Sequence, residues 1–344
     1  MGRRLLVTGG AGFIGSAFVR GHLRAYPEDT VVVLDKLTYA GNLANLAPVA
    51  NDPQYAARYQ FVHGDIGDAA LVGSLMPGVQ VVVNFAAETH VDRSILDPGG
   101  FIETDVRGTW VLLEAARRAG VDRFVQISTD EVYGEVPEGA SREDDPLLPR
   151  SPYAASKAGG ELMVRAYHVT YGLPTLITRA SNNFGPYQYP EKFLPVLITR
   201  ALDDQPIPLY GDGRQRRDWL YVDDHCAALE LVIERGEPGN AYNIGGGNER
   251  ENRVLAEQVL DLLGKPHSLI QPVVDRPGHD RRYAVDTTKL RALGWAPREG
   301  FDATLAATVR WYVANEAWWR PLQDAEYQAY YRQNYGDRAR LLER

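Results

Sequence analysis

Several kinds of residue and segment are scarce in this chain of 344 residues, and each scarcity excludes a class of protein. The chain has one cysteine, Cys226, which excludes an intramolecular disulfide framework and a zinc–cysteine cluster and is typical of the reducing cytoplasm. No apolar run approaches the roughly 18 residues of a membrane span, so we expect no membrane partner. The net charge of −8 disfavours nucleic acid as the main partner. The histidines lack the spacing of metal ligands, which predicts no metal site.

The composition that remains is that of an ordinary folded protein, with 44% hydrophobic and 24% charged residues. At roughly 150 residues per domain, the length suggests about two domains. Residues 1–181 alternate short β-branched runs with helical stretches, which predicts an α/β domain with a Rossmann-type, doubly wound parallel sheet. The predicted strands are 4–7, 31–34, 60–62, 81–85, 124–128 and 176–179, and the predicted helices are 13–25, 69–75, 102–119 and 153–171.

Residues 182–344 are punctuated by proline and glycine and predict a smaller, mixed α/β domain. We expect some of its segments to return and pack on the first domain. Within it, the sequence predicts a helix over 251–263 and a second helix whose apolar face carries Leu305, Val309, Tyr312 and Val313.

A glycine-rich turn follows the first predicted strand and opens the first predicted helix. Its spacing, Gly9, Gly12 and Gly15, is typical of a turn that lets a pyrophosphate approach backbone N–H groups at a helix N-terminus. Asp35 follows twenty residues later, at the end of the second strand, where a carboxylate can accept the ribose hydroxyls of NAD and repel the 2′-phosphate of NADP. Together these residues predict an NAD site, although Lys36 beside Asp35 leaves NADP as an alternative.

Tyr153 and Lys157 lie one turn apart on one face of a predicted helix. Lysine is scarce in this chain, with five among the 37 basic residues, so each position is informative. An ammonium group beside a tyrosine stabilises the phenolate, which lets the tyrosine act as a base near neutral pH. Ser128 and Thr129 end a neighbouring strand, and open α/β sheets gather their chemistry at the carboxyl ends of strands. We therefore expect these residues to form a catalytic centre.

The chain resembles the extended short-chain dehydrogenase/reductase family in a set of motifs that occur in the family's order. They are 9–15, 84–87, Ser128–Thr129, and Tyr153 with Lys157. Further stretches are similar to the dTDP-glucose 4,6-dehydratases within that family, namely DKLTYAGN (35–42), AAETHVDRS (86–94), STDEVYG (128–134), SNNFGPY (181–187) and DRPGHD (275–280). The resemblance implies an NAD-dependent lyase that converts dTDP-glucose to a 4-keto-6-deoxy sugar in deoxysugar biosynthesis. The chain departs from the pattern at Asp105, where such proteins usually carry asparagine.

The adjacent carboxylates Asp130 and Glu131 distinguish this reaction from simple hydride transfer. Removal of the C5 proton and loss of the C6 hydroxyl require a base and an acid side by side, and two carboxylates can divide these roles. We expect Glu131 to be the base and Asp130 the acid, with Tyr153 taking the C4 hydroxyl proton and Thr129 hydrogen-bonding the C4 oxygen. Lys157 completes the catalytic set.

The resemblance also implies binding residues. Those implied for NAD are Gly9, Gly12, Phe13, Ile14, Gly15, Asp35, Lys36, Leu37, Thr38, Gly41, Asp65, Ile66, Phe85, Ala86, Ala87, Glu88, Thr89, Thr104, Ser128, Tyr153, Lys157 and Asn183. Those implied for the nucleotide sugar are Thr89, His90, Thr129, Asp130, Glu131, Asn182, Lys192, Phe193, Pro208, Leu209, Tyr210, Arg217, Asn252, Asp275, Arg276, Pro277, Gly278 and His279. His90 is equally explained as an interior histidine with satisfied hydrogen bonds.

Two other functions fit the same fold. One is another nucleotide-sugar enzyme, an epimerase or a decarboxylase, against which Asp130 and Glu131 argue together. The other is a non-catalytic NAD-binding regulator, which has no need of Tyr153, Lys157 and the acidic pair. The resemblance further implies a homodimer formed through residues 102–119 and 153–171, both of which are apolar on more than one face.

Overall fold

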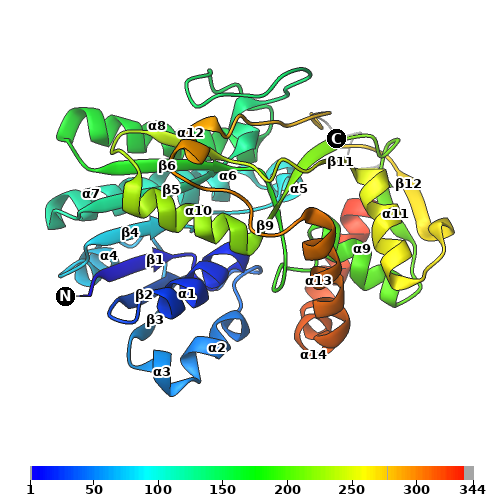
Figure 1. The fold of residues 1–344 in the computed structure, drawn as a ribbon, viewed down its shortest axis with the longest axis horizontal. Coiled ribbons are helices and arrows are strands. Elements are labelled where there is room, and N and C mark those ends of the chain that lie inside the picture. The colour runs from blue at the N-terminus through cyan, green and yellow to red at the C-terminus, as the bar shows by residue number, and fades with distance from the viewer. Residues whose placement is uncertain (1, 277, 337–344) are drawn as a thin grey trace.

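Short β-branched segments separated by amphipathic helices build a seven-stranded sheet in the computed structural model, which describes residues 2–276 and 278–336. Neighbouring strands are parallel throughout, in the order β10-β6-β5-β4-β1-β2-β3 (Figure 1). The strands are β1 (Arg4–Thr8), β2 (Thr30–Asp35), β3 (Tyr59–His63), β4 (Val81–Asn84), β5 (Arg123–Thr129), β6 (Thr175–Ala180) and β10 (Ala241–Ile244). The six strands predicted within residues 1–181 and the doubly wound fold class are confirmed, whereas β10 was not predicted.

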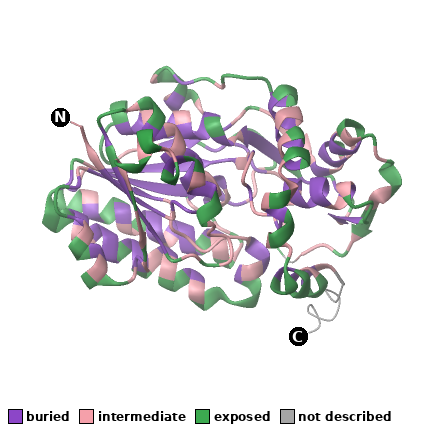
Figure 2. Cartoon of the chain, turned by 90° about the horizontal axis from the view of Figure 1, so that it is seen from below, coloured by how far each residue is buried: buried purple, intermediate pink, exposed green. Residues whose placement is uncertain are grey.

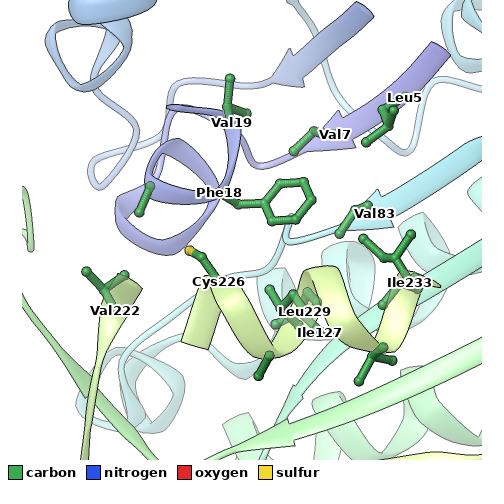
Figure 3. Close-up of a cluster of buried hydrophobic side chains, with 14 of the residues drawn as sticks. Leu5, Val7, Phe18, Val19, Val83, Ile127, Val222, Cys226, Leu229 and Ile233 are labelled. Carbon is green, nitrogen blue, oxygen red and sulfur yellow. The ribbon is translucent and has the colours of Figure 1, made fainter. Parts of the chain in front are cut away.

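Helices cover both faces of the sheet because its strands are apolar on both sides. One face packs against α1 (Phe13–Ala25), α10 (Val222–Arg235) and α12 (Thr288–Ala292), and Figure 3 shows the Phe18 ring of α1 pointing toward Val7 and Val83 of the strands, on the side of α10 that carries Cys226 and Leu229. The other face packs against α4 (Ala69–Leu75), α7 (Thr109–Ala119) and α8 (Pro152–Tyr171). Cys226 is therefore a buried thiol of the core.

The second part of the molecule lies beside the sheet and has its own core (Figure 1). It contains two small sheets, one of β7 (Asn182–Phe184), β9 (Arg216–Tyr221) and β11 (Glu249–Glu251) and one of β8 (Ile207–Tyr210) and β12 (Ile270–Val273). Its helices are α9 (Phe193–Leu202), α11 (Asn252–Leu263), α13 (Phe301–Ala314), α14 (Glu316–Trp319) and α15 (Ala325–Tyr331), followed by a π-helical turn, Arg332–Gly336. Because β10, α10 and α12 pack with the large sheet, residues after 181 contribute to both parts. The division at residue 181 stays a prediction.

Short helical elements complete the chain. They are α2 (Ala47–Ala50), α3 (Pro53–Ala56), α5 (Val91–Leu96), α6 (Pro98–Phe101) and the 3₁₀ turns Leu43–Leu46, Asp130–Tyr133, His267–Leu269 and Arg320–Leu322. Figure 2 shows the buried residues concentrated in the strands and on the inner faces of the helices that flank them.

Two details differ from the sequence prediction. Residues 102–119 do not form one regular helix, since the π-helical segment Ile102–Gly108 precedes α7. The wider turn places Asp105 in the interior beside α8. Val313 was wrongly assigned to the apolar face of α13, because its side chain is 46% exposed while Leu305, Val309 and Tyr312 are buried. The helix packs on α9, α11 and β9 through the side that carries those three residues.

Candidate active site

A cavity of about 430 Å³ opens at the carboxyl ends of the central strands, where the second part of the molecule covers the sheet. Strand register sets the positions of the residues that end these strands. Thr8 pairs with Asn84 across β1 and β4, and Thr129 pairs with Ala180 across β5 and β6. Beneath the cavity, the Thr8 hydroxyl donates to Asn84 Oδ1 (2.5 Å) and Asn84 Nδ2 donates to Gln126 Oε1 (2.8 Å). These buried bonds hold the strand ends in register.

The glycine turn after β1 forms one end of the cavity. Gly9 has φ +67°, and a Cβ there would lie 2.5 Å from the backbone nitrogen of Ala86. A Cβ on Gly15 would lie 2.4 Å from the carbonyl oxygen of Gly9, so both positions require glycine for close packing. Gly12 is the N-cap residue of α1 and lies in the cavity wall, and a Cβ there would lie 3.3 Å from the carbonyl oxygen of Gly9. The turn thus offers backbone N–H groups to an anionic pyrophosphate.

Asp35 lies at the end of β2 in the same part of the cavity. Its carboxylate accepts hydrogen bonds from the N–H groups of Ala11 (2.9 Å) and Leu37 (2.8 Å), which fixes its orientation. Burial raises the pKa of Asp35, and the two backbone hydrogen bonds oppose that effect. Lys36 forms an ion pair with Asp65 at 2.7 Å and is therefore not a free cation for a 2′-phosphate. The residues at this end fit a dinucleotide with an unphosphorylated adenosine ribose.

Tyr153 and Lys157 project from the first turns of α8 into the middle of the cavity wall. Ser151 caps this helix by accepting from the Ala154 N–H, and the Lys157 ammonium donates to the carbonyl oxygen of Ile127 at 2.7 Å. Burial lowers the pKa of Lys157, while the negative charges of Asp105 and Glu161 raise it.

The pKa of Tyr153 is raised well above 10, mainly by burial and further by nearby carboxylates, while a hydrogen bond with Thr129 lowers it. The carboxylates that oppose the phenolate, Glu131, Asp105 and Asp130, have raised pKa values themselves. Their protonation removes part of the negative charge around the phenol, so ionisation of Tyr153 depends on theirs.

The acidic pair begins the 3₁₀ turn that follows β5. Thr129 caps this turn by accepting from the Glu131 N–H at 3.3 Å, and its hydroxyl also lies 3.3 Å from Asp130 Oδ1. Burial and then the charge of Glu131 raise the pKa of Asp130 well above its usual range. Burial also raises the pKa of Glu131, but the guanidinium groups of Arg276 and Arg217 lower it. Asp130 is therefore the carboxyl group that stays protonated and can donate a proton, and Glu131 is the one more readily ionised and able to accept a proton.

Cationic side chains gather at the far end of the cavity. Arg217 is buried, donates to the Asp280 carbonyl oxygen at 2.9 Å and lies over the Tyr283 ring. Lys192 donates to Thr89 Oγ1 at 2.9 Å, and Arg276 lies 4.0 Å from Asp92. These cations suit an anionic group such as a diphosphate.

His90 lies in the cavity wall, but it also has an interior partner. Its Nδ1 lies 3.1 Å from the Tyr330 hydroxyl, with the two rings in an edge-to-face arrangement, and burial lowers its pKa to about 4. The geometry therefore accommodates both readings of His90 made from the sequence.

Most residues implied by the resemblance line this one cavity. Pro208, Leu209, Asp275, Gly278 and Leu37 are not in its wall, and Pro277 lies outside the described residues. Leu209 is fully buried in β8 and Leu37 packs against the sheet core, because both are apolar. Asp275 instead accepts from Gln215 (2.8 Å) and pairs with His279 (2.6 Å).

Several wall residues were missed from the sequence. They include Asp92, Gln188, Tyr189, Glu191, Trp219, His225, Tyr283 and Tyr335. Asp92 lies within the motif 86–94 and Glu191 precedes Lys192, so their positions in the chain carried a signal. Tyr335 carried none, because it reaches the cavity only through packing of the C-terminal segment against Tyr210, 5.7 Å between ring centroids.

Comparison with known proteins gives a consistent result. The family model described as GDP-mannose 4,6-dehydratase matches residues 6–308. A dTDP-glucose 4,6-dehydratase of Streptomyces niveus is 53% identical, covering 94% of this chain and 96% of that protein. The structure of DesIV, a dTDP-glucose 4,6-dehydratase from Streptomyces venezuelae with NAD and TYD bound, is 55% identical with a TM-score of 0.89, covering 93% and 99%.

A UDP-glucose 4-epimerase from Thermus thermophilus in complex with NAD is less similar, at 35% identity and a TM-score of 0.82, covering 91% of this chain and 99% of that one. The family model covers most of the chain and the dehydratases exceed half identity over nearly all of it. This chain therefore belongs to the GDP-mannose 4,6-dehydratase family of nucleotide-sugar enzymes.

Proposed function

We propose that this protein is an NAD-dependent dTDP-glucose 4,6-dehydratase, a hydro-lyase that converts dTDP-glucose to dTDP-4-keto-6-deoxyglucose and water. The observation that carries this proposal is the adjacent pair of Asp130, which is buried, and Glu131, which is partly buried, in one cavity with Tyr153 and Lys157. Relatives of more than 50% identity that bear this name support it. The solved relative with NAD and TYD bound supports both the cofactor and the nucleotide end of the substrate.

The first chemical step takes place around Tyr153. NAD, when bound at the glycine turn and Asp35, supplies oxidation at C4 and the later reduction at C6. Tyr153 removes the proton of the C4 hydroxyl, and Lys157 favours the phenolate because it brings a positive charge to the same helix face. Thr129, whose hydroxyl interacts with both Tyr153 and Asp130, holds the C4 oxygen.

The elimination belongs to the acidic pair. A ketone at C4 acidifies the C5 proton, and Glu131, whose charge Arg276 and Arg217 favour, removes it. Asp130, which burial keeps protonated, donates its proton to the departing C6 hydroxyl, which leaves as water. Glu131 then returns its proton to C5, and the proton that Tyr153 took from the C4 hydroxyl replaces the one that Asp130 lost, so the net change is loss of one water. Residues of both parts of the molecule line the cavity, so protein groups surround much of the space in which the sugar would react.

The alternatives make different use of the same fold. An epimerase needs hydride removal and return at one carbon and has no role for two adjacent carboxylates in the cavity wall. A non-catalytic regulator has no reason to bury Lys157 and Asp130, because burying ionisable groups costs free energy. Neither alternative accounts for the pair.

The test is incubation of the purified protein with dTDP-glucose, dTDP-galactose and UDP-glucose, without added reduced cofactor, while 4-keto-6-deoxy product is followed. We expect dTDP-glucose to be converted fastest, with no net consumption of NAD. If none of the three sugars is converted, the proposal fails. Interconversion of glucose and galactose without loss of the C6 oxygen would favour an epimerase instead.

The protein is a homodimer in this proposal, and its two candidate interface segments expose large apolar side chains. These are Ile102 and Trp110 on one segment, and Leu162, Val169 and Tyr171 on α8. Exposed apolar patches of this kind mark interaction sites.

We also place the protein in the cytoplasm, which its single, buried free cysteine supports. Among the described residues, no helix has both the length and the apolar character that spanning a membrane would require.

Leu162→Glu should therefore yield a monomer. A charge buried in an apolar interface costs about 3 kcal/mol, which weakens dimerisation by roughly 100-fold. Light scattering on the variant and on the matched control Val254→Glu, which changes an exposed residue of α11, measures the effect. A wild-type protein that is monomeric on dilution, or a Leu162→Glu variant that remains dimeric, would contradict this interface.

A further inference from the structure

Asp105 is a buried carboxylate that the mechanism above does not use, although it lies close enough to Tyr153 and Lys157 to shift their pKa values. It lies in the π-helical segment Ile102–Gly108, is 2% exposed and is not part of the cavity wall. Its Oδ2 accepts from the Ser156 hydroxyl at 2.5 Å, and its Oδ1 accepts from the Glu88 N–H at 3.2 Å. The first distance is typical of a hydroxyl bound to an ionised carboxylate.

The charged groups around Asp105 come from three elements. The helix α8 contributes Tyr153 and Lys157, and the loop after β4 contributes Glu88. On its own segment, Glu103 and Arg107 are exposed and pair with each other at 3.5 Å. Lys157 is therefore the cation that most favours the ionised form of Asp105. Tyr153, when it ionises, adds a second negative charge near Asp105.

The negative charge of Asp105 shifts the pKa values of Lys157 and Tyr153 in the same direction. Its negative charge raises the pKa of Lys157, because it favours the ammonium, and raises the pKa of Tyr153, because it opposes the phenolate. Burial raises the pKa of Asp105 itself to about 6, and Lys157 opposes that rise. Asp105 is thus charged above about pH 6 and neutral below it.

We propose that Asp105 is a positioning residue that sets the pH range of catalysis, by holding a buried negative charge behind both Tyr153 and Lys157. It acts through these two residues and touches neither substrate nor cofactor. This inference rests on the proposed function, since Tyr153 and Lys157 are assigned their roles there.

Replacing Asp105 by asparagine removes the negative charge and keeps the size and shape of the side chain. In Asp105→Asn, the amide oxygen can still accept from the Glu88 N–H, and the amide nitrogen can donate to Ser156 Oγ. The Ser156 hydroxyl then turns to the carbonyl oxygen of Tyr153, which already lies 2.8 Å away. Each hydrogen bond around residue 105 is kept, so a change in the pH profile reports the charge.

The test is the pH profile of kcat/KM for wild type and Asp105→Asn with dTDP-glucose. Because the variant lacks the charge, the pKa values of Tyr153 and Lys157 should both fall by about one unit. The variant should be more active than wild type on the acid flank and less active on the alkaline flank. Below about pH 6 the two profiles should converge, because Asp105 is then neutral in the wild type.

Glu103→Gln is the matched control, since it removes an exposed carboxylate from the same segment and should leave the profile unchanged. If Asp105→Asn does not fold, Ser156→Ala tests the same idea. It keeps the carboxylate but removes a hydrogen bond that lowers the pKa of Asp105, so the pH at which Asp105 becomes charged should rise above 6. The proposal is overturned if Asp105→Asn changes kcat/KM by the same factor at every pH, or leaves the pH profile unchanged.

A second readout does not require turnover. The ultraviolet absorbance of tyrosinate, titrated with and without Asp105→Asn and corrected by the matching Tyr153→Phe proteins, reports ionisation of Tyr153 alone. We expect its midpoint to fall by about one unit in Asp105→Asn. If wild type does not convert dTDP-glucose but the midpoint shifts, the proposed function fails while the charge effect stands. An unchanged midpoint overturns the inference whatever the activity.

Discussion

Tyr153→Phe should lower the turnover of dTDP-glucose about 10³-fold, because it removes the group that takes the C4 hydroxyl proton. The ring itself remains useful, since it packs edge-to-face on Phe101 with 6.3 Å between ring centroids. Folding and nucleotide-sugar binding should therefore be retained. Single-turnover measurement of C4 oxidation, together with equilibrium binding of dTDP-glucose, separates the chemical effect from a loss of affinity.

Tyr167→Phe is the matched control for this variant. Tyr167 lies on the same helix, and its hydroxyl donates to Glu114 at 2.7 Å, away from the cavity wall. Its loss should leave turnover unchanged. If Tyr153→Phe turned over at the rate of the control, Tyr153 would not be the base, and the acidic pair would have to take the C4 proton as well.

Glu131→Gln should abolish elimination while oxidation at C4 continues. Glutamine keeps the size of the side chain but cannot accept the C5 proton, so formation of the 4-keto-6-deoxy product should fall about 10³-fold. Exchange of the C5 hydrogen with solvent should fall equally. C4 oxidation, followed as reduced nicotinamide in a single turnover, should persist because Tyr153 and Thr129 are unchanged. This pattern separates the base from residues that only bind the sugar.

Glu135→Gln provides the comparison, since Glu135 lies four residues further along the same loop, outside the cavity wall, and pairs with Arg150. It should form product at the wild-type rate. A Glu131→Gln variant that retained full turnover, or that lost C4 oxidation and C5 exchange together, would contradict the division of roles between Glu131 and Asp130.

Much of the large sheet and its chemistry could be predicted from the sequence. Alternating β-branched and amphipathic segments are local signals, and six of the seven strands followed from them. Parallel strands bring their carboxyl ends to one edge, so Gly9, Asp35 and Thr129 were expected to meet although they are far apart in the chain. The acidic pair was recognisable because its two members are adjacent in the sequence.

Other features depended on contacts that no local pattern encodes. Strand β10 joins the sheet through pairing with β6, some sixty residues earlier in the chain, and it is a four-residue strand between glycine-containing segments. Leu37 lies within the motif 35–42 and Leu209 was expected to bind the sugar nucleotide, yet the structure buries the Leu209 side chain and packs that of Leu37 against the sheet core. Tyr335 and Tyr330 reach the cavity and His90 only because the C-terminal segment packs back across the second part of the molecule.

The sequence by itself determined the fold class, the dinucleotide turn and the identity of the proposed catalytic groups, because each rests on residues close together in the chain or at the ends of neighbouring strands. Only the tertiary structure decided how those groups are charged. The pKa values of Asp105, Asp130 and Glu131 depend on burial and on Arg217, Arg276 and Lys157, which come from other elements. Electrostatic effects grow as water is excluded, and exclusion of water is a property of the packed molecule.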